Sequence, residues 1–429
     1  MRYQVAILGA GPVGIEAALH AANAGLEPVV LEKSDSICGH VRQWGHVQLF
    51  SPFGWNASKL GKETVVSESK CELFGDEELV TGHQWVDAYF EPLSKSKALQ
   101  SRIRLGHQVL KVGRNRLGKM QQIGRAERLD DEFKILCKAN GSEVVIHSKY
   151  LIDATGCFGN HGFMGSGGMP ALGEMAIRET KQPFQDAADE LSSQGISHGL
   201  PDFAKIRFEK GRSRILLVGS GYSAATNALS IDQQSDESNV QLDWITRDKP
   251  EPLISIDDDV LSARQWLTKK ANGLPAKPNV NWMPGASIEM IEKGSMRRWN
   301  VRVNVDGQSQ DRAYDLIIVN VGNVPDLEML RPLQFHTCYA TEGPIKLAAA
   351  ILGQSGQDCT SIQLDHSQLL KTSEPGFFVV GAKSFGRNSQ FLIRNGLEQI
   401  EQVIQFIVAA EREIGGSSNL GDVVVESEA

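Results

Sequence analysis

The stretch YQVAILGAGPVGIEAALHAANAGLEPVVLE, residues 3–32, determines the fold that we expect for this chain. It contains an apolar run over 3–8, then a glycine-rich turn, then an alanine-rich run over 15–24 and a second apolar run over 27–31. Short apolar runs on either side of an alanine-rich run predict one strand–helix–strand unit.

Three glycines and one acid give this unit its predicted chemistry. Gly9 permits a tight turn, Gly11 lets the backbone approach a pyrophosphate, and Gly14 allows the helix to pack closely on the strand. The N-terminus of the helix attracts an anion, and Glu32 at the end of the second strand would accept hydrogen bonds from ribose hydroxyls. We therefore predict a dinucleotide site, with a purely structural turn as the alternative.

A second unit of the same kind begins at RILLVGSGYSA, residues 214–224. Gly219 and Gly221 follow an apolar run, Ala224 stands where the third glycine would be, and the next apolar run ends at Arg247. An arginine at this position suits a 2′-phosphate, which a carboxylate would repel. The second unit therefore favours NADPH. NADH binding, with Arg247 simply solvated, is the alternative.

Two such units predict an α/β protein with two Rossmann-like, three-layer dinucleotide-binding domains. The length of 429 residues agrees with two or three domains. Two further glycine turns follow apolar runs, ATG at 154–156 and NVGNVPD at 320–326. They are typical of places where a chain passes between two domains near a dinucleotide, so Thr155, Gly156 and Gly322 are candidate cofactor residues. Ordinary loops are the alternative.

Composition and charge exclude several classes of protein. Hydrophobic residues make up 41% and charged residues 22% of the chain, as in proteins that fold in water. The net charge of −8 is spread along the chain, which argues against a nucleic-acid partner. No apolar run of about 18 residues occurs and the chain starts directly with a strand pattern, so we expect no membrane partner and a cytoplasmic location.

The six cysteines have no spacing that predicts a redox pair or a metal site. They are Cys38, Cys71, Cys137, Cys157, Cys338 and Cys359. No C-x-x-C occurs, and no cysteine–histidine group has zinc-finger spacing. We expect reduced thiols that act as small hydrophobic side chains, and no metal site.

The order of these motifs resembles the flavoproteins with two dinucleotide-binding domains, among them the flavin-containing monooxygenases and related bacterial FAD-dependent oxidoreductases. The resemblance runs from residue 3 to about residue 410 and is specific at GAGPVGIEAALHAANAG, LIDATG, ILLVGSGYSA and ITR. It implies FAD at the first glycine motif and NADPH, or NADH, at the second. The implied FAD residues are Gly9, Gly11, Pro12, Gly14, Glu32 and Lys33, and the implied NADPH residues are Gly219, Gly221, Tyr222, Ser223 and Arg247.

The resemblance also implies a domain organisation. The NAD(P)H-binding domain, residues 211–324, would be inserted into an FAD-binding domain formed by residues 1–170 and 325–429. Residues 171–210 would connect the two domains.

Two loops are implied to lie beside the flavin ring. In the loop 39–56 the candidates are Gly39, Arg42 and Trp44 for cofactor binding, and Ser51 and Asn56 for catalysis. Asn56 loosely matches an asparagine that the family places near the reactive edge of the flavin. In the C-terminal region the candidates are Gly381, Lys383 and Arg387, the last two near the pyrimidine edge. For the first loop, which is rich in Trp and Phe, an ordinary core is the alternative.

The chain departs from the family pattern at two places. Phe163 begins the monooxygenase motif F-x-G-x-x-x-H, but Met169 occupies the place of the histidine. Many relatives have Gly-Asp after the last strand, whereas Ala382 follows Gly381 here. We interpret His46 and His161 as structural residues, with proton donation as the alternative.

These observations predict hydride transfer from NADPH to N5 of FAD, which depends on the positions of the two rings. For the second half of the reaction we expect a monooxygenase that oxygenates a small molecule with O2 through a C4a-(hydro)peroxyflavin. One alternative is a reductase or oxidase that passes electrons to a quinone, a protein or O2. Another is a flavin or nucleotide sensor without catalysis. The oligomeric state, including a homodimer, stays open.

Overall fold

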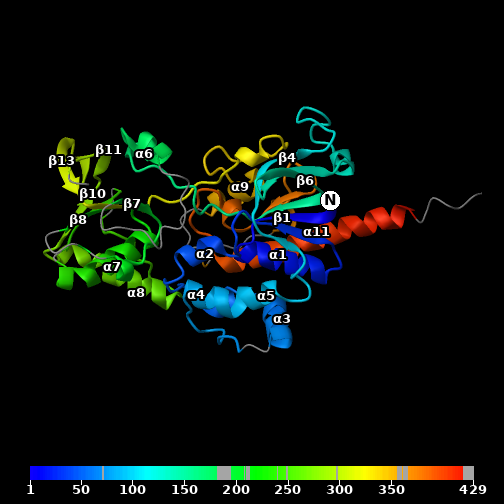
Figure 1. Ribbon diagram of the computed structural model, residues 1–429, viewed down its shortest axis with the longest axis horizontal. Coiled ribbons are helices and arrows are strands. Elements are labelled where there is room, and N and C mark those ends of the chain that lie inside the picture. Colours follow the sequence, from blue (N-terminus) through cyan, green and yellow to red (C-terminus); the bar gives the residue numbers. More distant parts are fainter. Residues whose placement is uncertain are drawn as a thin grey trace, which may run out of the picture.

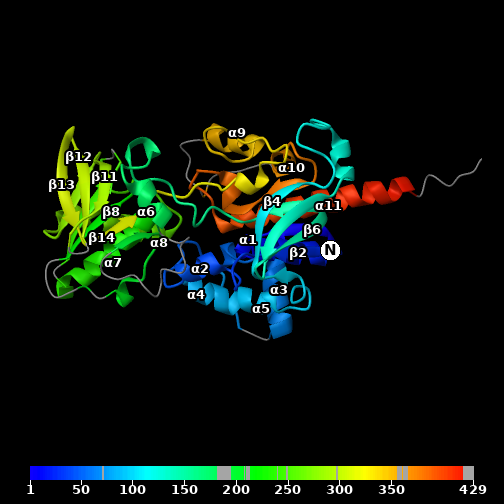
Figure 2. The same cartoon turned by 45° about the horizontal axis from the view of Figure 1, so that its top comes forward.

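The computed structural model describes residues 1–69, 72–180, 195–206, 208, 213–238, 240–247, 250–295, 298–354, 360 and 366–418. These residues form two lobes that lie side by side (Figure 1). One lobe contains the first and last parts of the chain, and the other contains the middle part. The same division is visible after rotation of the molecule (Figure 2).

The first lobe is built on a seven-stranded sheet with the order β3-β2-β1-β6-β5-β4, in which β15 also pairs with β6. The C-terminal half of β6 pairs in parallel with β1 and β15, and its N-terminal half pairs with β5 in an antiparallel hairpin. The last strand of the chain therefore joins the sheet that the first strand begins. The strands are β1 (Arg2–Leu8), β2 (Pro28–Leu31), β3 (Ile103–Arg104), β4 (His107–Arg114), β5 (Phe133–Ala139), β6 (Ser142–Asp153) and β15 (Phe377–Val379).

The second lobe contains a parallel five-stranded sheet with the order β10-β9-β8-β14-β7 and an antiparallel three-stranded sheet with the order β11-β12-β13. Strand β7 lies within the segment that the sequence predicts to connect the domains. The strands are β7 (Gly195–His198), β8 (Ser213–Val218), β9 (Val240–Thr246), β10 (Val280–Pro284), β11 (Ser287–Lys293), β12 (Trp299–Val305), β13 (Gln308–Tyr314) and β14 (Leu316–Val319).

The central parallel strands of both sheets are buried on two faces, which is why strands such as β2 and β14 are apolar throughout rather than alternating. In β1, Val5 and Ile7 belong to the core shared with the helices, while Ala6 and Leu8 belong to the core shared with the β4–β5 hairpin. In the second lobe, helices α7 (Tyr222–Ser238) and α8 (Ser262–Asn272) cover one face and the three-stranded sheet covers the other. The predicted α/β fold with Rossmann-like, three-layer domains is confirmed.

Helix α1 (Pro12–Asn23) shows how the sequence sets a helix boundary. Pro12 occupies its first turn, where a missing N–H costs nothing, and Gly25 follows its last turn with a positive φ of 79°. The C-terminal helix α11 (Ile393–Ser418) packs on α1 through apolar residues three and four positions apart, Ile400, Val403, Ile404 and Ile407.

The remaining helices lie around these two sheets. They are α2 (Gly39–Gln43), α3 (Lys59–Ser69), α4 (Gly82–Trp85), α5 (Glu91–Ser94), α6 (Glu174–Thr180), α7 (Tyr222–Ser238), α8 (Ser262–Asn272), α9 (Ile345–Gly353) and α10 (His366–Leu369). Within the described residues, no helix is both long enough and apolar enough to span a bilayer.

Candidate functional site

In the turn between β1 and α1, two glycines have no room for a side chain, and a third faces free space. Gly9 has a positive φ of 94°, and a methyl group added at Gly14 would overlap the carbonyl oxygen of Gly9. A methyl group at Gly11 would meet no atom within 4 Å. Gly11 therefore faces free space at the N-terminus of α1, where the helix has unpaired N–H groups and no side-chain cap. This geometry fits the pyrophosphate of a dinucleotide.

Glu32 closes the same turn from the other side. It is 8% exposed, and its two carboxylate oxygens accept hydrogen bonds from the N–H groups of Ala10 at 2.7 Å and Ser34 at 2.8 Å. A carboxylate has about four acceptor positions, so two stay available for ribose hydroxyls. Lys33 is exposed beside it.

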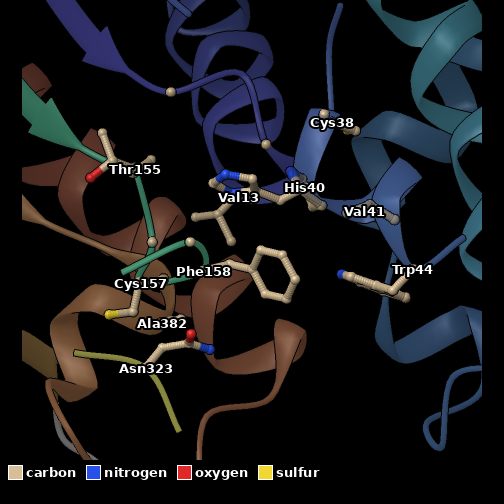
Figure 3. Close-up of a pocket in the computed structure, with 18 of the residues that line it drawn as sticks. Val13, Cys38, His40, Val41, Trp44, Thr155, Cys157, Phe158, Asn323 and Ala382 are labelled. Atoms are coloured by element: carbon tan, nitrogen blue, oxygen red, sulfur yellow. The ribbon is translucent and has the colours of Figure 1, made fainter. Parts of the chain in front are cut away.

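A single cavity of about 770 Å³ extends from this turn to the second lobe. Figure 3 shows Val13, Thr155 and Ala382 around one part of it, and Phe158 between His40 and Trp44 in the middle. The predicted site residues that line the cavity are Gly9, Gly11, Pro12, Glu32, Lys33, Gly39, Trp44, Ser51, Asn56, Thr155, Gly156, Tyr222, Ser223 and Gly381. Segments from both lobes thus share one cavity.

Other predicted site residues lie outside the cavity wall, among them Gly14, Gly219, Gly221 and Gly322. Arg42 forms ion pairs with Glu91 at 2.6 Å and Asp87 at 3.3 Å. Arg387 is exposed and forms an ion pair with Glu342 at 2.7 Å. The charges of both arginines are thus balanced by neighbouring carboxylates.

Ser51 and Asn56, the predicted catalytic residues, hold a turn together at the wall of the cavity. The Ser51 hydroxyl donates to Asn56 Oδ1 at 3.0 Å, and Asn56 Nδ2 donates to the carbonyl oxygens of Ser51 and Pro52 at 3.0 and 2.9 Å. Asn56 is fully buried. These bonds fix the shape of the loop, and the catalytic role of both residues stays a prediction.

The second glycine turn is constructed differently from the first. A methyl group at Gly219 would overlap the carbonyl oxygen of Asn320, whereas Ala224 is accommodated with no exposed surface. Gly221, like Gly11, faces free space. Arg247 is exposed just after β9.

The start of α7 connects this turn to the cavity. The Tyr222 ring contacts the Phe50 ring from the first lobe, with 5.4 Å between centroids. Tyr222, Ser223 and Thr226 all contribute to the cavity wall. The start of α7, which directly follows the second glycine motif, therefore lies in the wall of the same cavity as the first motif.

Burial shifts the pKa values of one histidine and two cysteines in this region of the molecule. Burial lowers the pKa of His161 to about 4, so its ring is neutral near pH 7, stacked on His198 at 4.6 Å. His46 is exposed. Burial raises the pKa of Cys157 to about 11 and also raises that of Cys38, which disfavours the reactive thiolate.

Cys38, Cys137, Cys157 and Cys338 are free thiols, and Cys71 and Cys359 lie outside the described residues. Over the ranges that the structure covers, no group of three or more metal-ligating side chains is found.

The sequence analysis did not identify Asp153, the buried partner of Lys383. Lys383 Nζ lies 2.7 Å from Oδ2 of Asp153, which is the last residue of β6. Asp153 directly precedes the ATG turn, which is the signal that could have identified it.

Comparison with known proteins supports a shared fold. The bacillithiol disulfide reductase Bdr (YpdA) from Bacillus cereus has a TM-score of 0.67 at 17% identity, with 96% of this chain and 100% of that chain covered. Thioredoxin reductase from Lactococcus lactis has a TM-score of 0.58 at 17% identity, covering 96% and 99%. DfoA, a cadaverine monooxygenase from Erwinia amylovora, has a TM-score of 0.61 at 14% identity, covering 96% and 95%. A search of curated proteins found no match.

The sequence pattern of one family, described as pyridine nucleotide-disulphide oxidoreductase, matches residues 3–343. Enzymes of this family depend on FAD and NAD(P)H, so the expected pair of cofactors is confirmed, as is the resemblance to flavoproteins with two dinucleotide domains. Because the match covers most of its length, this chain belongs to the pyridine nucleotide-disulphide oxidoreductase family.

Proposed function

We propose that this oxidoreductase uses NADPH to reduce FAD and that the reaction is a monooxygenation. The two electrons would pass from FAD to O2, one oxygen atom would be transferred to a small molecule held in the cavity, and the other would leave as water. The single observation that carries the proposal is the shared cavity. Its wall includes Pro12 at the start of α1 and Tyr222 and Ser223 at the start of α7. Hydride transfer needs two rings in contact, at about 3–3.5 Å, and a shared cavity allows this.

The residues at the first glycine motif fit FAD. The free space at Gly11 and the N-terminus of α1 would hold the pyrophosphate, and Glu32 would accept the ribose hydroxyls. When bound, FAD accepts a hydride from NADPH and passes two electrons to the acceptor. Trp44 and Phe158 give the middle of the cavity an aromatic wall that excludes water.

At the second motif, we propose that Ser223 and the N-terminus of α7 bind the pyrophosphate of NADPH. The exposed guanidinium of Arg247 would bind the 2′-phosphate. We further propose that the FAD-binding part comprises residues 1–170 and 325–429 and the NAD(P)H-binding part residues 211–324. The pairing of β15 with β6 in the first sheet supports this division.

The positions and pKa values of the cysteines support a transfer of electrons from FAD that uses no cysteine pair of the protein. A dithiol relay needs two neighbouring thiols, one of which is a thiolate. The sequence has no C-x-x-C, and the pKa of each of the two cysteines at the cavity wall, Cys38 and Cys157, is raised by burial. The electrons would therefore leave FAD without passing through the protein.

A second candidate is a reductase that transfers electrons from FAD to a small disulfide, with two thiols as products. The similarity to the bacillithiol disulfide reductase, which covers all of that chain, favours this candidate. Monooxygenases share the same fold, as DfoA does.

The test is reduction of the purified protein by NADPH without oxygen, followed by mixing with O2 and a panel of neutral sulfides, ketones and amines. We expect one oxygenated product for each NADPH consumed, with the second oxygen atom released as water. Formation of hydrogen peroxide alone with every compound would contradict the monooxygenation. Rapid reoxidation by a small disulfide, with release of thiols, would support the second candidate.

A further inference from the structure

Lys383 and Asp153 form a buried ion pair directly behind the cavity wall. Lys383 lies in the short helical turn Gly381–Phe385 after β15, and Asp153 is the last residue of β6. Their side chains are 1% and 0% exposed, with 2.7 Å between Nζ and Oδ2. Lys383 Nζ also donates to the Thr155 hydroxyl at 3.1 Å.

Thr155 completes the cluster. Its backbone N–H and its hydroxyl donate to Asp153 Oδ1, at 3.0 and 2.7 Å. The hydroxyl oxygen therefore donates its only hydrogen to Asp153 and accepts one bond from Lys383, which leaves one acceptor position. Because Thr155 lines the cavity, these bonds hold one part of the cavity wall in place.

The cluster joins two loops that are far apart in sequence but adjacent in the cavity wall. Ala154, Thr155 and Gly156 line the cavity on one side, and Gly381 and Ala382 line it next to them. The Val380 N–H also donates to the carbonyl oxygen of Asp153 at 2.9 Å. Removing two charges from water is costly, and such pairs are retained in some proteins because they fix one arrangement.

The loop that carries Lys383 is pressed against α1. Gly381 has a positive φ of 73°, and a methyl group there would lie 3.3 Å from the Val13 side chain. The Gly381 N–H donates to Gln399 of α11 at 2.8 Å. A shift of this loop would therefore change the cavity next to the first glycine motif.

We propose that the Lys383–Asp153–Thr155 cluster is the positioning device of the FAD site. It sets the distance between the ATG turn and the turn after β15, and so the shape of the cavity wall next to the first glycine motif. The cluster does so in a chain that has Ala382 where many relatives have an aspartate. Lys383 is thus a positioning residue rather than a direct contact of the flavin. This inference rests on FAD binding in this cavity but is independent of the electron acceptor.

The chain offers a matched control in a second buried ion pair. Arg128 and Glu374 are both 0% exposed, with 3.0 Å between Nε and Oε1, and Arg114 bonds to the same carboxylate at 2.8 Å. None of these three residues lines the cavity. A substitution in this pair therefore shows how much stability is lost when a buried charge partner is removed away from the cavity.

The experiment compares Lys383→Met with Arg128→Met in the full chain. Its readouts are the dissociation constant for FAD, the reduction potential of bound FAD and the melting temperature. We expect Lys383→Met to weaken FAD binding about tenfold or more and to shift the potential. Arg128→Met, which leaves Glu374 with Arg114 as its partner, should lower the melting temperature but keep FAD affinity within about twofold of the unsubstituted protein. The double variant Asp153→Asn/Lys383→Met should recover most of the affinity, because asparagine can still accept from Thr155.

If Lys383→Met does not fold, Thr155→Val tests the same cluster with a smaller change. It removes only the hydroxyl and should weaken FAD binding about threefold to tenfold. The proposal is overturned if Lys383→Met and Thr155→Val weaken FAD binding no more than Arg128→Met does at an equal loss of melting temperature. A failure of the unsubstituted protein to bind FAD would instead contradict the proposed function.

Discussion

The two glycine turns of this chain follow the same pattern but differ at their third residue and at the end of the strand that follows. The first allows no side chain at its third glycine, Gly14, and the carboxylate of Glu32 accepts a hydrogen bond from the Ala10 N–H within the turn. The second accommodates Ala224, and its strand-end residue, Arg247, is exposed. The two turns therefore offer a bound nucleotide different surroundings, a buried carboxylate beside the first and an exposed guanidinium beside the second.

The largest expected effect comes from exchanging the third residues of the two motifs. Gly14→Ala places a methyl group on the Gly9 carbonyl oxygen, which should destabilise the protein by about 3 kcal/mol and yield colourless protein. Ala224→Gly should cost only about 1 kcal/mol and leave FAD bound. Melting curves and the visible spectrum measure both. Equal losses in the two variants would refute the difference between the turns.

The next largest effect concerns the acid of the first motif. Glu32→Ala removes the acceptor of the Ala10 and Ser34 N–H groups as well as the partner expected for the ribose. Because hydrogen bonds to charged groups contribute about 1.5–3 kcal/mol each, FAD binding should weaken about a hundredfold. NADPH affinity, measured on protein saturated with FAD, should stay the same. Unchanged retention of FAD during gel filtration would be the contrary result.

A smaller effect is expected at the second motif. Arg247→Ala should raise the KM for NADPH about tenfold, because one charge-assisted contact with the 2′-phosphate is lost. The KM for NADH should hardly change, since NADH has no such phosphate. Steady-state assays with both nucleotides provide the comparison, and a parallel rise in both KM values would exclude the phosphate contact.

The smallest effect on folding is expected where both turns are open. Gly11→Ala and Gly221→Ala each add a methyl group that meets no protein atom within 4 Å. Each should change the free energy of unfolding by less than about 0.5 kcal/mol. Each should weaken only its own cofactor, FAD for Gly11 and NADPH for Gly221, because the methyl group enters the space of a pyrophosphate. Titrations of both variants with both cofactors test this separation.

The sequence predicted the local parts of this molecule better than the long-range ones. The roles of Gly9 and Gly14 follow from spacing within one strand–helix unit, and the structure shows the close approach that the spacing implies. The ion pair of Lys383 with Asp153 joins residues that are 230 positions apart, and no local pattern specifies it. Arg42 was assigned to the flavin because of its loop, but its partners Asp87 and Glu91 come from a later part of the chain.

The strand β7 was missed for a different reason. Its residues, GISH at 195–198, show neither alternation nor a long apolar run. They form a strand because β14 offers a free edge for parallel pairing. Tertiary pairing determined this element, and local propensity did not.

The central claim is that two nucleotide sites share one cavity, so that electrons pass directly between them. Titration of the purified, FAD-loaded protein with NADPH in the absence of oxygen tests it most directly. Our account predicts loss of the visible flavin absorbance with one equivalent of NADPH, and with Arg247→Ala only at higher NADPH concentration. Flavin that stays oxidised in the presence of excess NADPH would contradict it and would favour a binding protein without catalysis.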